Sequence, residues 1–289
     1  MKRFFFSLII LSLLIFIGLV TWLLTPESQW FAGPNQIGVI ELSGLIDSVQ
    51  DPLKAFREFR KNTNVKCVLL RIESPGGGIG ASQELYREVK RTIEVKPVVA
   101  SLGGIAASGG YYIASAANRI VANPGTITGS IGVISYFPNL QELFKKIGFS
   151  ANIIKSGRFK DIGNPDREMT HEERELLQST MDEAHRQFIR DVAHGRNLPE
   201  EKVREVADGR IFMGEKAQQL GLVDELGNFE DAIKTSALLG KIEEEPDLLY
   251  AKKRKRSLLD FLIGSEISEQ LDGYINGSLS FLRYQVPSM

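Results

Sequence analysis

The sequence predicts an α/β fold in which a parallel sheet is covered by helices. Two observations support this prediction. Short apolar segments typical of buried strands alternate with amphipathic segments typical of helices, and the apolar segments are continuous rather than alternating. Val65–Ile72 is such a continuous run, and Ser82–Ile93, which follows it, repeats apolar side chains on one helical face. A strand, helix, strand order of this kind is typical of parallel sheets.

The same reasoning assigns the other elements in chain order. Further strands are expected at 37–42, 97–101, 119–122, 150–154, 208–212 and 222–224, and further helices at 52–61, 111–117, 139–147, 199–206, 215–220 and 229–239. Thr170 and Glu173 form a capping box, Thr-x-x-Glu, which predicts the start of a long helix ending near His194.

Composition excludes several classes of protein. The 289 residues are 43% hydrophobic and 25% charged, with a formal net charge of -1, so the chain can build a full-sized core but offers no electrostatic argument for nucleic acid. Its single cysteine, Cys67, makes neither a disulfide framework nor a zinc cluster. The three histidines have no metal-ligand spacing. We therefore expect no metal, no cofactor and no nucleic-acid partner.

The N-terminus predicts a membrane anchor. Residues 1–24 contain an uncharged run, Phe4–Leu24, which is long enough as a helix to span a hydrocarbon core of about 30 Å. A cleaved signal peptide is the alternative, but its apolar region would be shorter and followed by a small-x-small site. Lys2 and Arg3 place the N-terminus in the cytoplasm, so the rest of the chain is expected outside it, on a single-pass protein of the cell (inner) membrane.

Three further segments follow the anchor. Residues 25–36 contain Pro26, Gly33 and Pro34 and are predicted to be a tether. Residues 37–240 form the α/β domain, and residues 241–289 form a basic linker and an amphipathic tail. The basic run 252–256 would suggest a nuclear signal or a nucleic-acid arm in a cytosolic protein. Outside the membrane it indicates a solvated linker, with contact to anionic lipid as the alternative.

A glycine-rich stretch, Gly103–Tyr112, places Ser108 where a strand is expected to pass into a helix. A serine there could be a nucleophile whose oxyanion is held by main-chain N–H groups. A helix N-cap on a tightly packed helix is the alternative. A second glycine-rich turn, Ser74–Gly78, follows the strand Val65–Ile72, so both turns are expected at adjacent strand ends, where sites lie in open α/β sheets.

A nucleophilic serine needs a base, and no histidine precedes His171. The loop Lys155–Gly163 contains two lysines and one arginine. A lysine acts as a base only if desolvation or a nearby cation lowers its pKa toward neutrality. Spacing alone does not choose between the two lysines.

Five stretches together resemble the signal peptide peptidase A (SppA) family of membrane-bound serine proteases, which belongs to the ClpP/crotonase clan. They are SPGGG at 74–78, AASGGYYIASAA at 106–117, TGSIGV at 128–133, SGRFKDIGNPDREMTHEER at 156–174 and ADGRIFMGEKAQQLGLVDELG at 207–227. The resemblance covers most of residues 37–240 and implies repeated ββα units, with a parallel sheet covered by helices, after the N-terminal transmembrane helix. It implies Ser108 as nucleophile, Lys160 as general base, Gly77 and the Ser108 N–H as oxyanion donors, and Ser130 as a hydrogen-bond partner of the lysine. A turn hydroxyl is the alternative role for Ser130.

The resemblance also implies the function. Remnant signal peptides left in the membrane after preprotein processing would be the peptide substrates of this serine endopeptidase. The long form of the family has two fold copies, so this single copy implies a ring-shaped homo-oligomer in which Ser108 and Lys160 meet across subunits. The alternatives are a protease of this fold that acts on other membrane proteins, a non-catalytic membrane-tethered scaffold, and a crotonase-type acyl-CoA enzyme.

Overall fold

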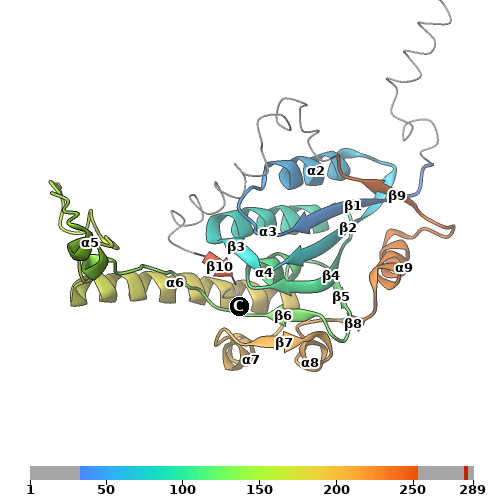
Figure 1. Cartoon of the computed structure of the whole chain (residues 1–289). Helices are drawn as coiled ribbons and strands as arrows, with labels where there is room; N and C mark the ends of the chain where they lie inside the picture. The colour runs from blue at the N-terminus through green and yellow to red at the C-terminus, as the bar shows by residue number, and fades with distance from the viewer. Residues whose placement is uncertain (1–32, 253–282, 286–289) are drawn as a thin grey trace, which may run out of the picture.

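The computed structural model describes residues 33–252 and 283–285, and its elements are labelled as in Figure 1. The predicted anchor, Phe4–Leu24, and most of the predicted tail lie outside these residues. Within the described ranges, no helix has the length and apolar character needed to cross a membrane.

The strands are β1 (Gln36–Ser43), β2 (Val65–Ser74), β3 (Gly76–Gly78), β4 (Val98–Ala107), β5 (Arg119–Ala122), β6 (Ile127–Gly129), β7 (Ile211–Met213), β8 (Glu225–Leu226), β9 (Asp247–Tyr250) and β10 (Arg283–Gln285). The helices are α2 (Gln50–Lys61), α3 (Ile79–Ile93), α4 (Gly109–Ala114), α5 (Gln141–Ile147), α6 (His171–Arg196), α7 (Glu200–Val206), α8 (Gly214–Gln219) and α9 (Phe229–Gly240).

The main sheet has the strand order β7-β6-β4-β2-β1-β9, with β5 pairing to both β4 and β8. Of its pairings among the described strands, only that of β6 with β7 is antiparallel, so the predicted α/β fold with a mostly parallel sheet is confirmed. Alternate side chains of β2 enter two separate clusters: Val68, Leu70 and Ile72 pack toward α2, α3 and α4, whereas Cys67 and Leu69 pack toward α9. Helices therefore cover both faces of the sheet (Figure 1).

Four differences from the sequence predictions concern short or extended segments. Strand β4 continues to Ala107, because the stretch from Gly103 that was predicted to be a turn forms a bulge against β2. Strands β3 and β6 were not predicted, because three residues are too few to show the pattern of apolar side chains that indicates a strand. Strand β9 lies in the segment predicted to be a linker and pairs with β1, so the sheet extends past residue 240.

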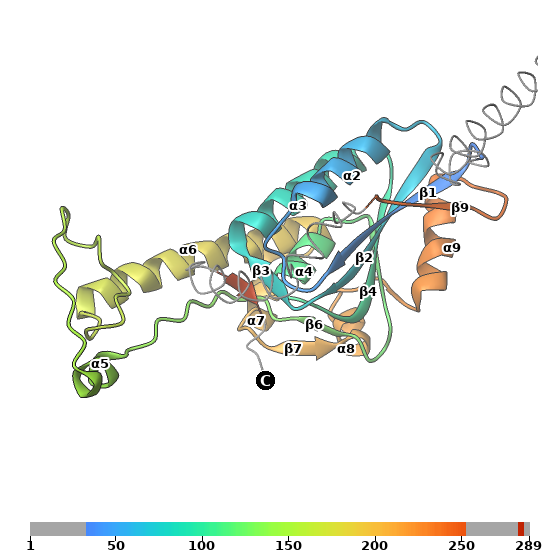
Figure 2. The ribbon, with the colours of Figure 1, turned by 45° about the horizontal axis from the view of Figure 1, so that its top comes forward.

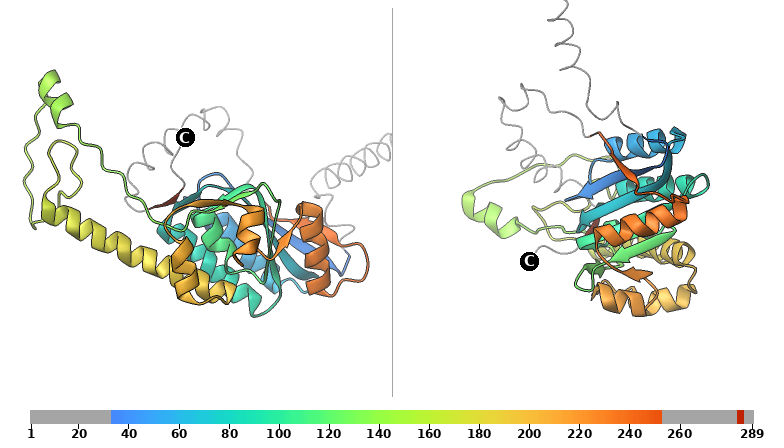
Figure 3. Two further views of the ribbon diagram at one scale, coloured as in Figure 1. Left: turned by 90° about the horizontal axis from the view of Figure 1, so that it is seen from below. Right: turned by 90° about the vertical axis from the view of Figure 1, so that its right-hand side faces the viewer.

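The fourth difference is the predicted strand 150–154, which is wrong: the segment has no regular structure. It belongs to residues 134–170, which we call the arm. In Figures 2 and 3 the arm projects away from the sheet together with the N-terminal part of α6. Ile154 is fully exposed in the arm, so its apolar side chain enters no core formed by the described part of this chain.

Helix α6 connects the arm to the body of the molecule. Its 26 residues span about 39 Å. Glu173 is the one buried residue in the first half, whereas Phe188, Ile189 and Val192 are among those buried in the second half. The predicted capping box is present, with the Thr170 hydroxyl and the Glu173 carboxylate each accepting a backbone N–H of the other residue. The long helix thus carries the arm on an end that the core does not enclose.

Candidate active site

Ser108 lies between the end of β4 and the start of α4, as the sequence predicts. Ser108 is fully buried, and its Oγ is enclosed without a hydrogen-bond partner among the described residues. It does not act as a side-chain cap for α4. The N-cap alternative for its hydroxyl is therefore not what the structure shows, and the hydroxyl is left available for another group.

The backbone of Ser108 has φ 53° and ψ −117°, a region that non-glycine residues rarely adopt. Within the described residues, positive φ at a non-glycine position occurs at Ser108, Ser130, Asn197 and Lys241. The last two are the left-handed C-caps of α6 and α9, which is an ordinary role for that conformation. The two serines have no such explanation, and strained backbone of this kind concentrates at functional sites.

The pairing of β4 with β6 brings these two serines together. Ala107 pairs with Gly129 in parallel register, and the Ser108 N–H continues the ladder by donating to the Gly129 carbonyl at 2.8 Å. The Ser108 N–H, which the family resemblance implies as an oxyanion donor, is thus bonded within the β4–β6 ladder in this structure. Sequence patterns could not indicate this bond, since β6 is only three residues long.

Gly77 lies beside this turn on β3, which packs against α4. The parallel bridge between Gly77 and Ile46 uses the Gly76 carbonyl and the Gly78 N–H, both at 3.0 Å from the backbone of Ile46. Because successive residues of a strand direct their polar groups to opposite edges, the N–H of Gly77 faces away from Ile46. A Cβ at Gly77 would lie 2.4 Å from the Ile46 carbonyl oxygen, so only glycine fits here.

Strand β10 occupies the edge that Gly77 faces. It is antiparallel to β3, with Tyr284 opposite Gly77. Residues far apart in the chain thus meet at the predicted oxyanion glycine, with β10 beside β3 in Figure 1. An extended segment of this chain thus pairs along this edge as an added strand, which is the mode that β-strand addition of peptides uses.

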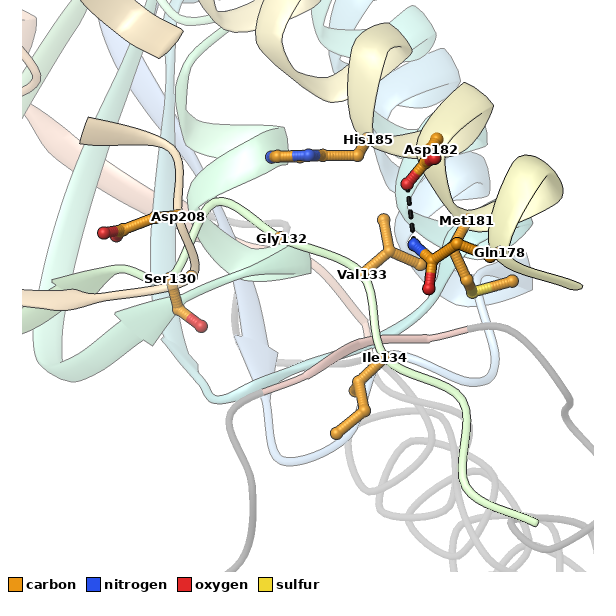
Figure 4. Close-up of a pocket in the computed structure, with 10 residues that line it drawn as sticks. Ser130, Gly132, Val133, Ile134, Gln178, Met181, Asp182, His185 and Asp208 are labelled. Atoms are coloured by element: carbon orange, nitrogen blue, oxygen red, sulfur yellow. Dashed lines mark hydrogen bonds between the residues drawn. The ribbon is translucent and has the colours of Figure 1, made fainter. Parts of the chain in front are cut away.

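A pocket of about 330 Å³ opens next to Ser130, between α6 and the loops at 132–134 and 208–209. Val133 and Met181 supply apolar side chains to its wall, and His185 extends into it from α6 (Figure 4). The Nε2 of His185 is buried without a hydrogen-bond partner among the described residues. Although charged residues flank it in the sequence, the His185 side chain is only partly exposed.

Lys160 is exposed and belongs to the arm, which projects away from the sheet in Figure 2. Because Ser108 Oγ has no hydrogen-bond partner among the described residues, the Lys160 amine of the same chain does not bond it. Three other cations on the same stretch are paired: Lys155 with Asp161, Arg158 with Glu172, and Arg167 with both Asp161 and Glu173. Lys160 has no ion pair among the described residues. The amine of Lys155 is engaged by a carboxylate, which makes Lys155 less available to a second group than Lys160.

Among residues 33–252 and 283–285, no three side chains of histidine, cysteine, aspartate and glutamate gather as metal ligands would. At the Ser108 turn, a buried serine hydroxyl lies next to the main-chain N–H groups at the start of α4. Such a set is typical of acyl transfer through a serine nucleophile.

The sequence matches peptidase family S49 over residues 90–243. The chain belongs to this family. It is 45% identical over 234 residues to a protein of Synechocystis sp. that is named as a protease, covering 80% of this chain and 84% of the relative. It is 36% identical over 248 residues to the chloroplastic serine protease SPPA of Arabidopsis thaliana, covering 80% of this chain and 37% of that longer protein.

Among solved structures, the chain resembles a mutant form of a membrane-bound stomatin-specific protease, 1510-N, with a TM-score of 0.50. The match covers 76% of this chain and 99% of the other at 16% identity, which supports the fold alone. Membership of family S49 identifies the protein as a peptidase, and its SppA-type relatives agree with the resemblance found from the sequence motifs.

Proposed function

We propose that this peptidase is a serine endopeptidase in which Ser108 attacks the peptide carbonyl and Lys160 of a neighbouring copy acts as the base. The observation that carries the proposal is the separation of two complementary groups. Within the described chain, Ser108 Oγ is buried on a strained turn without a partner, and the one unpaired cation of the 155–167 stretch lies on an arm that leads away from it. A second copy supplies the missing contact.

The exposed side chains of the arm support a contact with another copy. Tyr136 is 85% exposed, and Ile147, Phe149 and Ile154 are also exposed. An apolar group of this size is expected to be covered by protein. In a head-to-tail ring each arm reaches the next subunit, so each site takes its serine from one copy and its lysine from another.

The reaction proceeds through an acyl-enzyme. Neutral Lys160 accepts the hydroxyl proton as Ser108 Oγ bonds to the peptide carbonyl carbon. The protonated lysine then gives that proton to the leaving nitrogen as the peptide C–N bond breaks. Water, deprotonated by the same lysine, hydrolyses the ester and restores Ser108. Ser130, adjacent to Ser108 through the β4–β6 register, accepts a hydrogen bond from the lysine.

The developing oxyanion is held by Gly77 and by Gly109, which replaces Ser108 in this role. The N–H of Gly109 comes directly after the nucleophile and donates to no backbone acceptor among the described residues. A strained turn that leads directly into a helix gives the residue after the nucleophile this role in other serine hydrolases. The substrate strand pairs along the Gly77 edge.

The substrate class follows from the membrane prediction. We propose that the uncharged segment Phe4–Leu24 anchors the protein in the cell membrane, in contact with membrane lipid and with the protease domain outside the cytoplasm. An anchored endopeptidase meets apolar peptides that remain in the membrane, and we propose that remnant signal peptides are its substrates. Other membrane proteins are the alternative substrates.

The test uses the full-length protein in detergent. A fluorophosphonate probe should label the wild type and not Ser108→Ala. For a fluorogenic peptide that the wild type cleaves, Lys160→Ala should lower kcat by about a thousandfold or more. Loss of one catalytic residue has an effect this large when the base and the nucleophile act together. Lys146→Ala, at an exposed lysine of α5 on the same arm, is the matched control and should remain within several-fold of the wild type. If the probe labels Ser108→Ala at the wild-type rate, Ser108 is not the nucleophile, and if Lys160→Ala has the wild-type kcat, Lys160 is not the base. If the probe does not label the wild type at all, the non-catalytic scaffold is favoured.

A further inference from the structure

The turn that carries Lys160 has little backbone support of its own. Residues 150–170 contain turns but no helix or strand. The Lys160 N–H donates to the Gly157 carbonyl at 3.3 Å, and the Ile162 N–H to the Phe159 carbonyl at 3.2 Å, which are the long end of hydrogen-bond distances. Something other than secondary structure must fix this turn if Lys160 is to reach a reacting atom reproducibly.

Arg167 links this turn to helix α6. Its Nε donates to Asp161 Oδ2 at 3.2 Å, and one terminal nitrogen donates to the Asp161 carbonyl at 3.3 Å. The other terminal nitrogen donates to Glu173 Oε2 at 2.8 Å. One guanidinium thus contacts the residue next to Lys160 on one side and the first turn of α6 on the other.

The helix end of this link is itself fixed. Glu173 is 3% exposed, and its Oε2 also accepts the Thr170 N–H at 2.9 Å in the capping box. Hydrogen bonds from Arg167 and from Thr170 lower the pKa of Glu173 to about 2. The carboxylate is therefore charged at any pH where a lysine could act as a base. Further along, α6 is buried among core residues such as Phe188.

The turn end is fixed in the same way. Lys155 and Arg167 both pair with Asp161, and their hydrogen bonds lower the pKa of this aspartate. Asp161 is thereby held between two cations, and its neighbour Lys160 is left, among the described residues, as the unpaired cation of the stretch. The network holds the backbone of the turn without using the amine of Lys160.

We propose that Arg167 is a positioning residue that fixes the Lys160 turn on the end of α6, through Asp161 on one side and Glu173 on the other. This inference rests on the proposed function, because it assigns Arg167 a role only through Lys160. Arginine suits the role because its planar fork makes several directed hydrogen bonds at once, which a lysine cannot match. Misplacing a catalytic group by about 1 Å can lower a rate about 100-fold.

The test compares variants of the full-length protein on one fluorogenic peptide. Arg167→Gln should lower kcat about 100-fold with KM within about twofold of the wild type, because the turn loosens while the substrate edge on the body is untouched. Arg167→Lys keeps the charge but not the fork and should lose about tenfold. Arg158→Gln removes the exposed pair with Glu172 on the same stretch and should stay within about threefold of the wild type.

A double-mutant cycle separates positioning from a general structural role. In the Lys160→Ala background, Arg167→Gln should cause no further fall in the rate at which a fluorophosphonate probe labels Ser108, because its effect passes through the missing lysine. A further fall equal to that seen with Lys160 present would overturn the proposal. Thermal unfolding and gel filtration check that each variant is folded and assembled. If Arg167→Gln does not fold, Arg167→Lys decides the question, and wild-type kcat in it overturns the proposal.

The two proposals fail differently. Wild-type kcat in Lys160→Ala would remove the assigned base, and the role of Arg167 with it. Loss of activity in Lys160→Ala together with wild-type kcat in Arg167→Gln would leave the base in place and refute only the positioning role.

Discussion

The body of the molecule and the arm hold their key residues by different means. Ser108 is fully buried, and neighbouring strands determine its backbone. Lys160 is exposed on a stretch without regular structure, where side-chain ion pairs take the place of strands. The core of the body therefore positions Ser108, whereas the position of Lys160 depends on one network of ion pairs and on the protein surface that covers the arm. This difference predicts which changes alter activity and which alter stability.

The largest effect is expected from combining two inactive proteins. Ser108→Ala and Lys160→Ala should each be inactive alone. When both are co-expressed with different tags and purified as mixed assemblies, some sites pair an intact serine with an intact lysine. Random mixing in equal amounts gives about a quarter of the wild-type number of sites. Each working site needs a subunit with an intact serine next to a subunit with an intact lysine, and each of these is half of the mixture.

The measurement is peptide cleavage by the doubly tagged fraction, with each singly mutated protein as the control. Mixed assemblies that stay inactive at every ratio would place serine and lysine within one chain. A wild-type protein that is active as a monomer would lead to the same conclusion.

How far the sequence could predict this molecule follows from the same comparison. The strands and helices that bury their own apolar faces, such as Val65–Ser74 and Ile79–Ile93, agree with the prediction because their partners are in the same chain. Segment 150–154 has an equally apolar pattern, but Ile153 and Ile154 are exposed, because no part of the described chain covers them. An apolar run predicts that a segment is buried, but it does not identify the part of the protein that buries it.

The candidate site shows the same limit. The strand-to-helix turn at Ser108 could be predicted from the flanking apolar segments. The bond from the Ser108 N–H to Gly129 could not, since it depends on a three-residue strand. Spacing left Lys155 and Lys160 equivalent, and the family resemblance implied Lys160. The pairing of Lys155 with Asp161 is a second difference between them, which spacing could not indicate.

A smaller effect is expected at the Gly77 edge of the body. Strand β10 pairs with β3 there, so a substrate strand has to displace it. A tethered segment competes at a high effective concentration, about millimolar. Deleting residues 283–289 should therefore raise kcat/KM by about tenfold, mainly through a lower KM. Deleting only residues 286–289 retains β10 and should have little effect, and equal activity of both truncated proteins would show that β10 does not obstruct substrate.

The smallest effect is expected at Glu73, which supports the body side of the site. Leu102 pairs with Ile72 and Ala106 with Ser74, so β4 has two extra residues against β2 at this point. The Glu73 carboxylate accepts the N–H groups of Gly104 and Ile105 in this bulge, at 2.9 and 3.1 Å. The two acceptors compensate for the ladder bonds that the bulge interrupts.

Glu73→Ala should cost about 1 kcal/mol of unfolding free energy, which lowers Tm by roughly 2–4 °C in a domain of this size. It should leave kcat close to that of the wild type, because the pairing of β4 with β6 still fixes Ser108. Glu84→Ala, on the exposed face of α3, is the control and should leave Tm unchanged. The comparison with Arg167 is the informative part: the change on the arm should lower the rate strongly, whereas this change in the body should lower Tm and leave the rate nearly unchanged. A fall in kcat at Glu73 as large as that at Arg167 would show that the body positions its serine no more robustly than the arm positions its lysine.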